Sequence, residues 1–243
     1  MILGIVGSPR KNGLTNRLVD AALEGSRLEN YEVEKIHLVD FNVKPYTEVH
    51  KNCPKALNLL CEEAEAIVLG SPVYWGDISG IAKSFMETVS IPNADGKPAL
   101  GIAIAGGTGK GLLSGIQSIC HFFFHKRMRA IDPTPVSRFN LEEATEELVV
   151  SGHNLARLLK GNRPFQSLSE VSKYYQSLPF LNSDILDEYM LLASQLLKIS
   201  QSDDVEDARR DYEKASSLIR SGNRVDAIGY AVHAYELLYF KAD

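Results

Sequence analysis

The sequence has few cysteines, no excess of positive charge and no long apolar run. Only three of the 243 residues are cysteine, and no two of them form a C-x-x-C pair, which argues against a disulfide framework. The formal net charge of -5 argues against nucleic acid as the main partner. No uninterrupted apolar stretch is long enough to cross a bilayer, and Met1 leads directly into a short apolar run. We therefore expect a cytoplasmic protein with no membrane partner.

Two common phosphate-binding motifs are also missing from the first glycine-bearing turn, residues 7–15. Its sequence, Gly-Ser-Pro-Arg-Lys-Asn-Gly-Leu-Thr, has neither the Gly-Lys-Ser/Thr ending of a P-loop nor a G-x-G-x-x-G pattern. The turn nevertheless lies between a predicted strand, 1–6, and a predicted helix, 14–25, so free backbone N–H groups and a helix N-terminus point at one place. Four side chains there can donate hydrogen bonds to phosphate: Ser8, Arg10, Asn12 and Thr15. An ordinary polar loop is the alternative interpretation.

Apolar runs alternate with helical patterns through the first two thirds of the chain. The predicted strands are residues 1–6, 31–39, 66–70, 99–105 and 128–131. The predicted helices are residues 14–25, 54–61, 78–89, 112–123 and 141–159. This alternation predicts an α/β fold: a doubly wound, five-stranded parallel sheet with the flavodoxin-like strand order 2-1-3-4-5. In that order the loops after the first, third and fourth strands open onto one crevice.

Two further loops at this crevice have the composition of a ligand site. The second loop, Ser71 to Gly76, offers backbone N–H groups and the aromatic surface of Tyr74 and Trp75, which suits a planar ring. Aromatic residues are also favoured at subunit interfaces. The third loop, residues 106–111, is rich in glycine, which lets the backbone approach a ligand closely; a flexible connector is the alternative. Together the loops predict a mononucleotide site. FMN fits this site best, because one loop can hold a ring and another can hold a phosphate.

The three loops carry a resemblance to a known family. Gly7-Ser-Pro-Arg-Lys-Asn-Gly-Leu-Thr, Gly70-Ser-Pro-Val-Tyr-Trp-Gly and Ala105-Gly-Gly-Thr-Gly-Lys-Gly resemble the NAD(P)H-dependent FMN reductase family of flavodoxin-like proteins, and the likeness covers about residues 1–161. It implies that the FMN phosphate is held by Ser8, Arg10, Asn12, Gly13, Leu14 and Thr15. It implies that the ring is held by Pro72, Val73, Tyr74, Trp75, Gly76, Gly106, Gly107 and Thr108. Ser71 completes the predicted cofactor-binding set.

The cysteines depart from the most similar members of that family, the archaeal and bacterial iron-sulfur flavoproteins. Those proteins carry a compact run of four cysteines, C-x-x-C-x-x-C…C, in the segment after the second strand. Here only Cys53 stands near the expected positions, and Tyr46, Val49 and Asn52 occupy places where the other cysteines would fall. A four-iron cluster normally needs four thiolates, so we predict no iron-sulfur cluster and no other metal site.

The resemblance implies an oxidoreductase that uses bound FMN. Hydride would pass from NADH or NADPH to FMN, and electron transfer to an unidentified acceptor would follow: a quinone, free flavin, metal ion or protein. Because the flavin carries this chemistry, we predict no catalytic side chain. The alternative is a catalytically degenerate flavodoxin-like scaffold, or an FMN-binding protein, that acts through its C-terminal segment in protein interaction.

The pattern changes after residue 161. Residues 162–182 contain proline and several serines and are predicted to form a linker with one short helix. Residues 183–243 show strong amphipathic periodicity and are predicted to form an all-α extension of two or three helices. We therefore expect a flavodoxin-like FMN-binding domain at 1–161 followed by these two segments. Their apolar faces must be covered, so we expect a homo-oligomer, a dimer or tetramer, in preference to a docking site for a different protein.

Overall fold

The computed structural model describes residues 1–240 and contains one mixed sheet flanked by helices. The strands in this part of the chain are β1 (Ile2–Val6), β2 (Val33–His37), β3 (Ala66–Tyr74), β4 (Asp77–Ile78), β5 (Pro98–Ala105), β6 (Arg129–Ala130) and β7 (Val136–Ser137). The first five α-helices are α1 (Leu14–Arg27), α2 (Lys55–Glu63), α3 (Gly80–Thr88), α4 (Leu112–His125) and α5 (Leu141–Leu159). The remaining α-helices are α6 (Leu168–Ser177), α7 (Ile185–Ile199), α8 (Val205–Arg220) and α9 (Arg224–Tyr239). One turn of 3-10 helix, Leu38–Asp40, follows β2.

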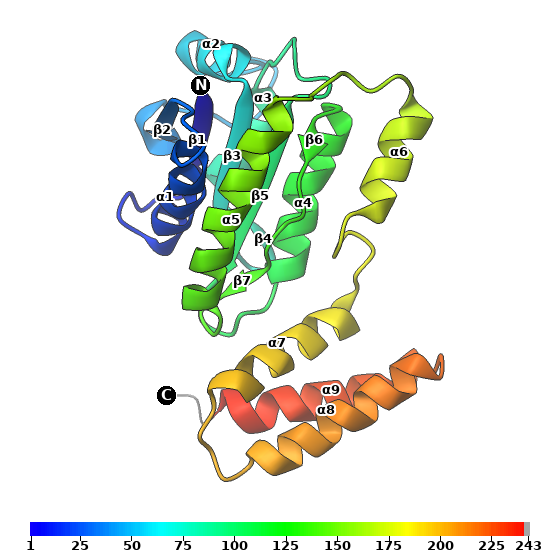
Figure 1. Cartoon of the computed structure of the whole chain (residues 1–243). Coiled ribbons are helices and arrows are strands. Elements are labelled where there is room, and N and C mark those ends of the chain that lie inside the picture. Colours follow the sequence, from blue (N-terminus) through cyan, green and yellow to red (C-terminus); the bar gives the residue numbers. More distant parts are fainter. Residues whose placement is uncertain (241–243) are drawn as a thin grey trace.

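The sheet has the predicted doubly wound order. Its five main positions run β2-β1-β3-β5-β6, with every neighbouring pair parallel. Gly4 of β1 stands between Lys35 of β2 and Val68 of β3, which fixes the register across the three strands. The carboxyl ends of the strands lie at the lower edge of the sheet in Figure 1. The predicted fold class is confirmed.

Alternation along each strand divides the core between the two faces of the sheet. In β1, Ile2 and Val6 face the layer that contains α1 and α5, while Leu3 and Ile5 face α2, α3 and α4. In β3, Val68 packs in the layer with α1 and α5, and the adjacent residues Ile67 and Leu69 pack on the opposite face. Side chains on both faces of these strands are buried, as expected for central strands of a parallel sheet.

The number of strands is seven within residues 1–240, whereas the sequence predicts five. The extra strand β4 arises because Trp75 and Gly76 adopt positive φ angles of 54° and 85°, closing a hairpin in which Val73 pairs with Ile78. The last sheet position is split into β6 and β7, which pair with opposite ends of β5. Residues 131–135 separate them, and two prolines there cannot donate to a ladder.

A predicted helix end at Gly25 is wrong, because α1 continues to Arg27. Gly25 lies where α1 meets α5, and a Cβ atom at Gly25 would lie 1.8 Å from the carbonyl oxygen of Val149. Gly152 of α5 faces α1 in the same way, with an added Cβ only 1.7 Å from the carbonyl oxygen of Ala22. Gly25 therefore permits the close approach of α1 and α5 and does not end α1.

The C-terminal helices lie at the carboxyl edge of the sheet. Figure 1 shows α7, α8 and α9 as a helical layer below that edge, whereas α6 runs alongside α4. Tyr174 and Tyr175 of α6 donate hydrogen bonds to the carbonyl oxygens of Ala130 and Met128, at 2.6 and 2.8 Å. The segment expected as a linker thus packs on the sheet domain through its helix. The division into 1–161, 162–182 and 183–243 stays a prediction.

Among the helices within residues 1–240, none combines the length and the apolar character that a membrane crossing requires.

Candidate functional site

The first loop joins β1 to α1 and leaves the helix N-terminus open. The backbone N–H of Gly7 donates to the carbonyl oxygen of Gly70 at 2.7 Å, which ties the end of β1 to β3. The N-cap of α1 is Gly13, and no side chain of residues 1–240 caps the helix. The first N–H groups of an uncapped helix lack intrahelical partners and carry partial positive charge. This end of α1 is therefore suited to bind an anion.

Two buried hydroxyl groups stand at this helix end. Ser8 and Thr15 are only 4% and 2% exposed. The Ser8 hydroxyl oxygen accepts a hydrogen bond from the Arg10 backbone N–H at 3.1 Å, so its own proton remains free to be donated. Within residues 1–240 the Thr15 hydroxyl has no hydrogen-bond partner, and the exposed Arg10 side chain has no ion-pair partner. By contrast, neighbouring Lys11 forms an ion pair with Asp40.

The second predicted loop, Ser71 to Gly76, is the end of β3 and the tip of the β3–β4 hairpin. The predicted strand end at residue 70 is wrong, because β3 continues to Tyr74 by pairing with β5 and β4. The hairpin tip, Trp75 and Gly76, requires positive φ at both residues, and the Trp75 side chain is fully exposed. A bulky residue is uncommon in that conformation, so the hairpin holds Trp75 at some conformational cost. Tyr74, just before the tip, is about half exposed.

A pair of buried serines holds the base of this hairpin. The Ser79 hydroxyl donates to the carbonyl oxygen of Gly7 and accepts from the Ala82 backbone N–H at 3.2 Å, capping α3. The Ser71 hydroxyl oxygen accepts from the Ser79 backbone N–H at 3.0 Å. Together they join the ends of β1 and β3 to the start of α3. Ser71 thus has a visible structural role beneath the loop.

The third loop follows β5. An added Cβ at Gly106 or Gly107 would meet no atom of residues 1–240 within 4 Å, so both residues border open space in the described part of the chain. The other end of the loop is tightly packed, because a Cβ at Gly111 would lie 2.6 Å from the Gly76 Cα atom. Ser114 of α4 also donates a hydrogen bond to the carbonyl oxygen of Gly76. The second and third loops are therefore in direct contact.

The three loops enclose one pocket of about 360 Å³ at the carboxyl edge of the sheet. Ser8, Tyr74 and Gly107, one from each loop, all line it. The predicted cofactor-binding residues that line the pocket are Ser8, Arg10, Gly13, Leu14, Thr15, Pro72, Val73, Tyr74, Gly106 and Gly107. Its volume falls in the usual range for small-molecule sites. Sequence reasoning missed Ile104, which also lines the pocket; its position near the end of β5 was the available signal.

Five predicted site residues lie outside this pocket lining. Asn12 is exposed on the first loop, and Ser71 is fully buried below the hairpin. Trp75 projects from the hairpin tip. Gly76 lies on the wall of a neighbouring cavity, between the hairpin and α7. The Thr108 carbonyl oxygen accepts a hydrogen bond from the Tyr235 hydroxyl at 2.8 Å.

The three thiols are buried away from the pocket. Burial raises the pKa of the Cys61 and Cys120 thiols to about 12 and also raises the pKa of Cys53. Residues 1–240 contain no group of three or more histidine, cysteine, aspartate or glutamate side chains placed to hold a metal ion. The predicted lack of an iron-sulfur cluster stays a prediction.

These pKa values predict unreactive thiols in the native protein. The thiolate is the nucleophile, and at pH 8 thiols with raised pKa values stay protonated. Ellman's reagent should therefore titrate none of the three cysteines in the folded protein and all three in denaturant. Rapid reaction of even one thiol before unfolding would contradict the burial described here.

Comparison with known proteins places this pocket in a family context. The family model "NADPH-dependent FMN reductase" matches residues 1–139. An iron-sulfur flavoprotein of Archaeoglobus fulgidus is 31% identical over 122 residues, which are 44% of this chain and 56% of that protein. An iron-sulfur flavoprotein of Methanocaldococcus jannaschii is 34% identical over 151 residues, 55% of this chain and 78% of that protein. The chain thus spans just over half the length of the first relative.

Solved structures show the same fold. A flavodoxin from the domain Archaea superposes with a TM-score of 0.51 at 21% identity, covering 66% of this chain and 99% of that one. The Paracoccus denitrificans flavoenzyme FerB, an NAD(P)H:(acceptor) oxidoreductase, gives a TM-score of 0.50 at 16% identity over 67% of this chain and 98% of that one. The family match extends over more than half of the chain and contains all three loops. The chain belongs to the NADPH-dependent FMN reductase family.

Proposed function

We propose that the protein is an FMN-dependent oxidoreductase that uses NADH or NADPH and passes electrons to a separate acceptor. The observation that carries this proposal is the convergence of three segments on one pocket: the loop after β1, the carboxyl end of β3 and the loop after β5. Ligands of doubly wound folds bind where the strand order reverses, and these segments lie at that point. The family match and the flavoprotein relatives support the same cofactor.

The residues in the pocket fit FMN. Donors for its phosphate come from the start of α1, the hydroxyls of Ser8 and Thr15, and the guanidinium of Arg10, which has no ion-pair partner within residues 1–240. Pro72, Val73 and Tyr74 of the hairpin and the open backbone at Gly106 and Gly107 provide flat surface for its ring. Bound FMN would supply the acceptance of hydride and the release of electrons, and the chain's own residues would position it.

Arg10→Ala should weaken FMN binding by about 1.5–3 kcal/mol, because it removes a charged hydrogen-bond donor from the phosphate site. The dissociation constant is measured by quenching of FMN fluorescence. Lys11→Ala is the matched control: it removes the adjacent positive charge, but Lys11 is paired with Asp40. If FMN affinity is the same in Arg10→Ala and the wild type, the phosphate binds elsewhere.

Anaerobic addition of NADPH or NADH to the FMN-loaded protein tests turnover. Loss of the visible flavin absorbance is the expected result, and comparing the two nucleotides gives the preferred donor. A yellow protein that neither nucleotide bleaches would favour the non-catalytic alternative, in which the chain binds FMN without using it.

Light scattering of the same preparation tests the proposed dimer or tetramer.

A further inference from the structure

The C-terminal helices contact the third loop of the FMN pocket directly. Tyr235 of α9 is almost fully buried, and its hydroxyl donates to the Thr108 carbonyl oxygen at 2.8 Å. The ammonium group of Lys110 lies 5.4 Å from the ring centres of both Tyr189 and Tyr235. A Cβ at Gly109 would lie 2.6 Å from a methyl carbon of Leu192, so α7 packs against the loop backbone. The extension thus contacts three successive residues of the loop.

One carboxylate from α7 completes this contact. The Glu188 Oε1 atom accepts a hydrogen bond from the Gly111 backbone N–H at 2.8 Å, and Oε2 accepts from the Leu113 backbone N–H at 3.0 Å. Gly111 is the N-cap of α4 and has no side chain with which to cap it. Glu188 therefore supplies the cap, together with a negative charge favourable at a helix N-terminus.

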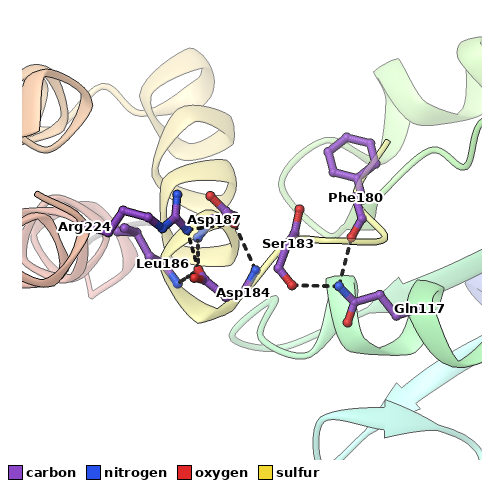
Figure 2. A network of polar contacts seen from close by, with 7 residues as sticks. All are labelled: Gln117, Phe180, Ser183, Asp184, Leu186, Asp187 and Arg224. Carbon is purple, nitrogen blue, oxygen red and sulfur yellow. Dashed lines mark hydrogen bonds and ion pairs between the residues drawn. The ribbon is translucent and has the colours of Figure 1, made fainter. Parts of the chain in front are cut away.

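The start of α7 is anchored to α4. Figure 2 shows the Gln117 side-chain amide donating to the carbonyl oxygens of Phe180 and Ser183, at 2.9 and 2.8 Å. Gln117 lies on α4, the same helix that Glu188 caps. The chain entering α7 is thus held against α4 next to the point where Glu188 acts.

The start of α7 is also anchored to α9. Asp184 and Asp187 form a capping box at the first turn of α7. In Figure 2 the Arg224 guanidinium reaches both carboxylates, at 2.8 and 3.0 Å. Glu188 follows directly in this turn, so its carboxylate is presented by a backbone that is fixed from two sides.

The geometry points to Glu188 as a positioning residue for FMN, an inference that rests on the proposed function. Its carboxylate fixes Gly111, and Gly111 packs on Gly76 of the hairpin. The same loop begins with Gly106 and Gly107, which line the FMN pocket. We infer that Glu188 holds the third loop against the hairpin, so that the helical extension is part of the cofactor site.

The test compares Glu188→Ala and Glu188→Gln in the full-length protein. Without FMN, amide hydrogen exchange at Gly111 and Leu113 should be faster in Glu188→Ala than in the wild type, because both N–H groups lose their acceptor. The FMN dissociation constant should rise about tenfold, the equivalent of one ordinary hydrogen bond, because the loop loses its anchor while the contacts of FMN itself are kept. Glu188→Gln keeps one acceptor oxygen, so its amide exchange rates and its FMN dissociation constant should lie between those of Glu188→Ala and the wild type. The circular dichroism of bound FMN should change in parallel.

Asp207→Asn is the matched control, since it removes a carboxylate from the same extension. Asp207 pairs with Arg210 within α8 and leaves the loop untouched, so exchange, affinity and flavin dichroism should match the wild type. If Glu188→Ala lowers only the melting temperature and leaves affinity and dichroism unchanged, Glu188 is merely structural and the inference is overturned. Unchanged amide exchange would overturn it too. Failure of the wild type to bind FMN would instead refute the proposed function and this inference with it.

Discussion

Replacing Gly152 with alanine is expected to lower the free energy of unfolding by about 3 kcal/mol. The added Cβ would lie 1.7 Å from the Ala22 carbonyl oxygen, which is helix backbone and cannot rotate away. The helices α1 and α5 would have to separate, and the hydrogen bond from the Ser26 hydroxyl to the Gly152 carbonyl oxygen, now 3.0 Å, would be lost. Urea denaturation measures the loss.

Gly229→Ala is the matched control, because it makes the same chemical change in another helix. Gly229 lies within α9 and is exposed, and among the described residues nothing lies within 4 Å of an added Cβ. Alanine is the better helix former, so this variant should gain about 0.5–1 kcal/mol. Equal stability of Gly152→Ala and the wild type would show that α1 and α5 do not pack as described.

Gly106→Leu is expected to weaken FMN binding by on the order of 100-fold, about 2.7 kcal/mol, while the protein stays folded. Gly106 lines the pocket, and no atom in the described part of the chain lies within 4 Å of an added Cβ. A leucine side chain can therefore be accommodated by the protein, but it would occupy space that the flavin ring needs. FMN titration and a thermal melt, carried out on one preparation, separate the two effects.

Gly161→Leu controls for the added apolar side chain. Gly161 is exposed after α5, and an added Cβ there would likewise have no neighbour from residues 1–240 within 4 Å. Its FMN affinity and melting temperature should match those of the wild type. A folded Gly106→Leu protein with wild-type FMN affinity would mean that the cofactor does not lie against the third loop.

The periodicity of the sequence was sufficient to predict the sheet, because buried parallel strands and amphipathic helices leave strong local patterns. Local patterns do not locate features that depend on packing or pairing with segments distant in the sequence. Gly25 looks like a helix end until α5 is packed against it. The strand β7 has only two residues, next to Pro133 and Pro135, and is recognised only through its pairing with β5.

The site was predictable to the extent that topology determines it. Once the strand order is known, the carboxyl ends of β1, β3 and β5 must lie together, which brings Ser8, Tyr74 and Gly107 to one pocket. The capping of α4 by Glu188 was not predictable, because the two lie 75 residues or more apart and no motif links them. Glu188 appears in the sequence as one acidic residue in the first turn of an amphipathic helix.

The most direct measurement of the central claim is the FMN content of the wild-type protein after incubation with excess FMN and gel filtration. If the three loops form one cofactor site, the protein should emerge yellow and carry one FMN per chain. A colourless protein, with flavin eluting only as the free molecule, would contradict the assignment of this pocket.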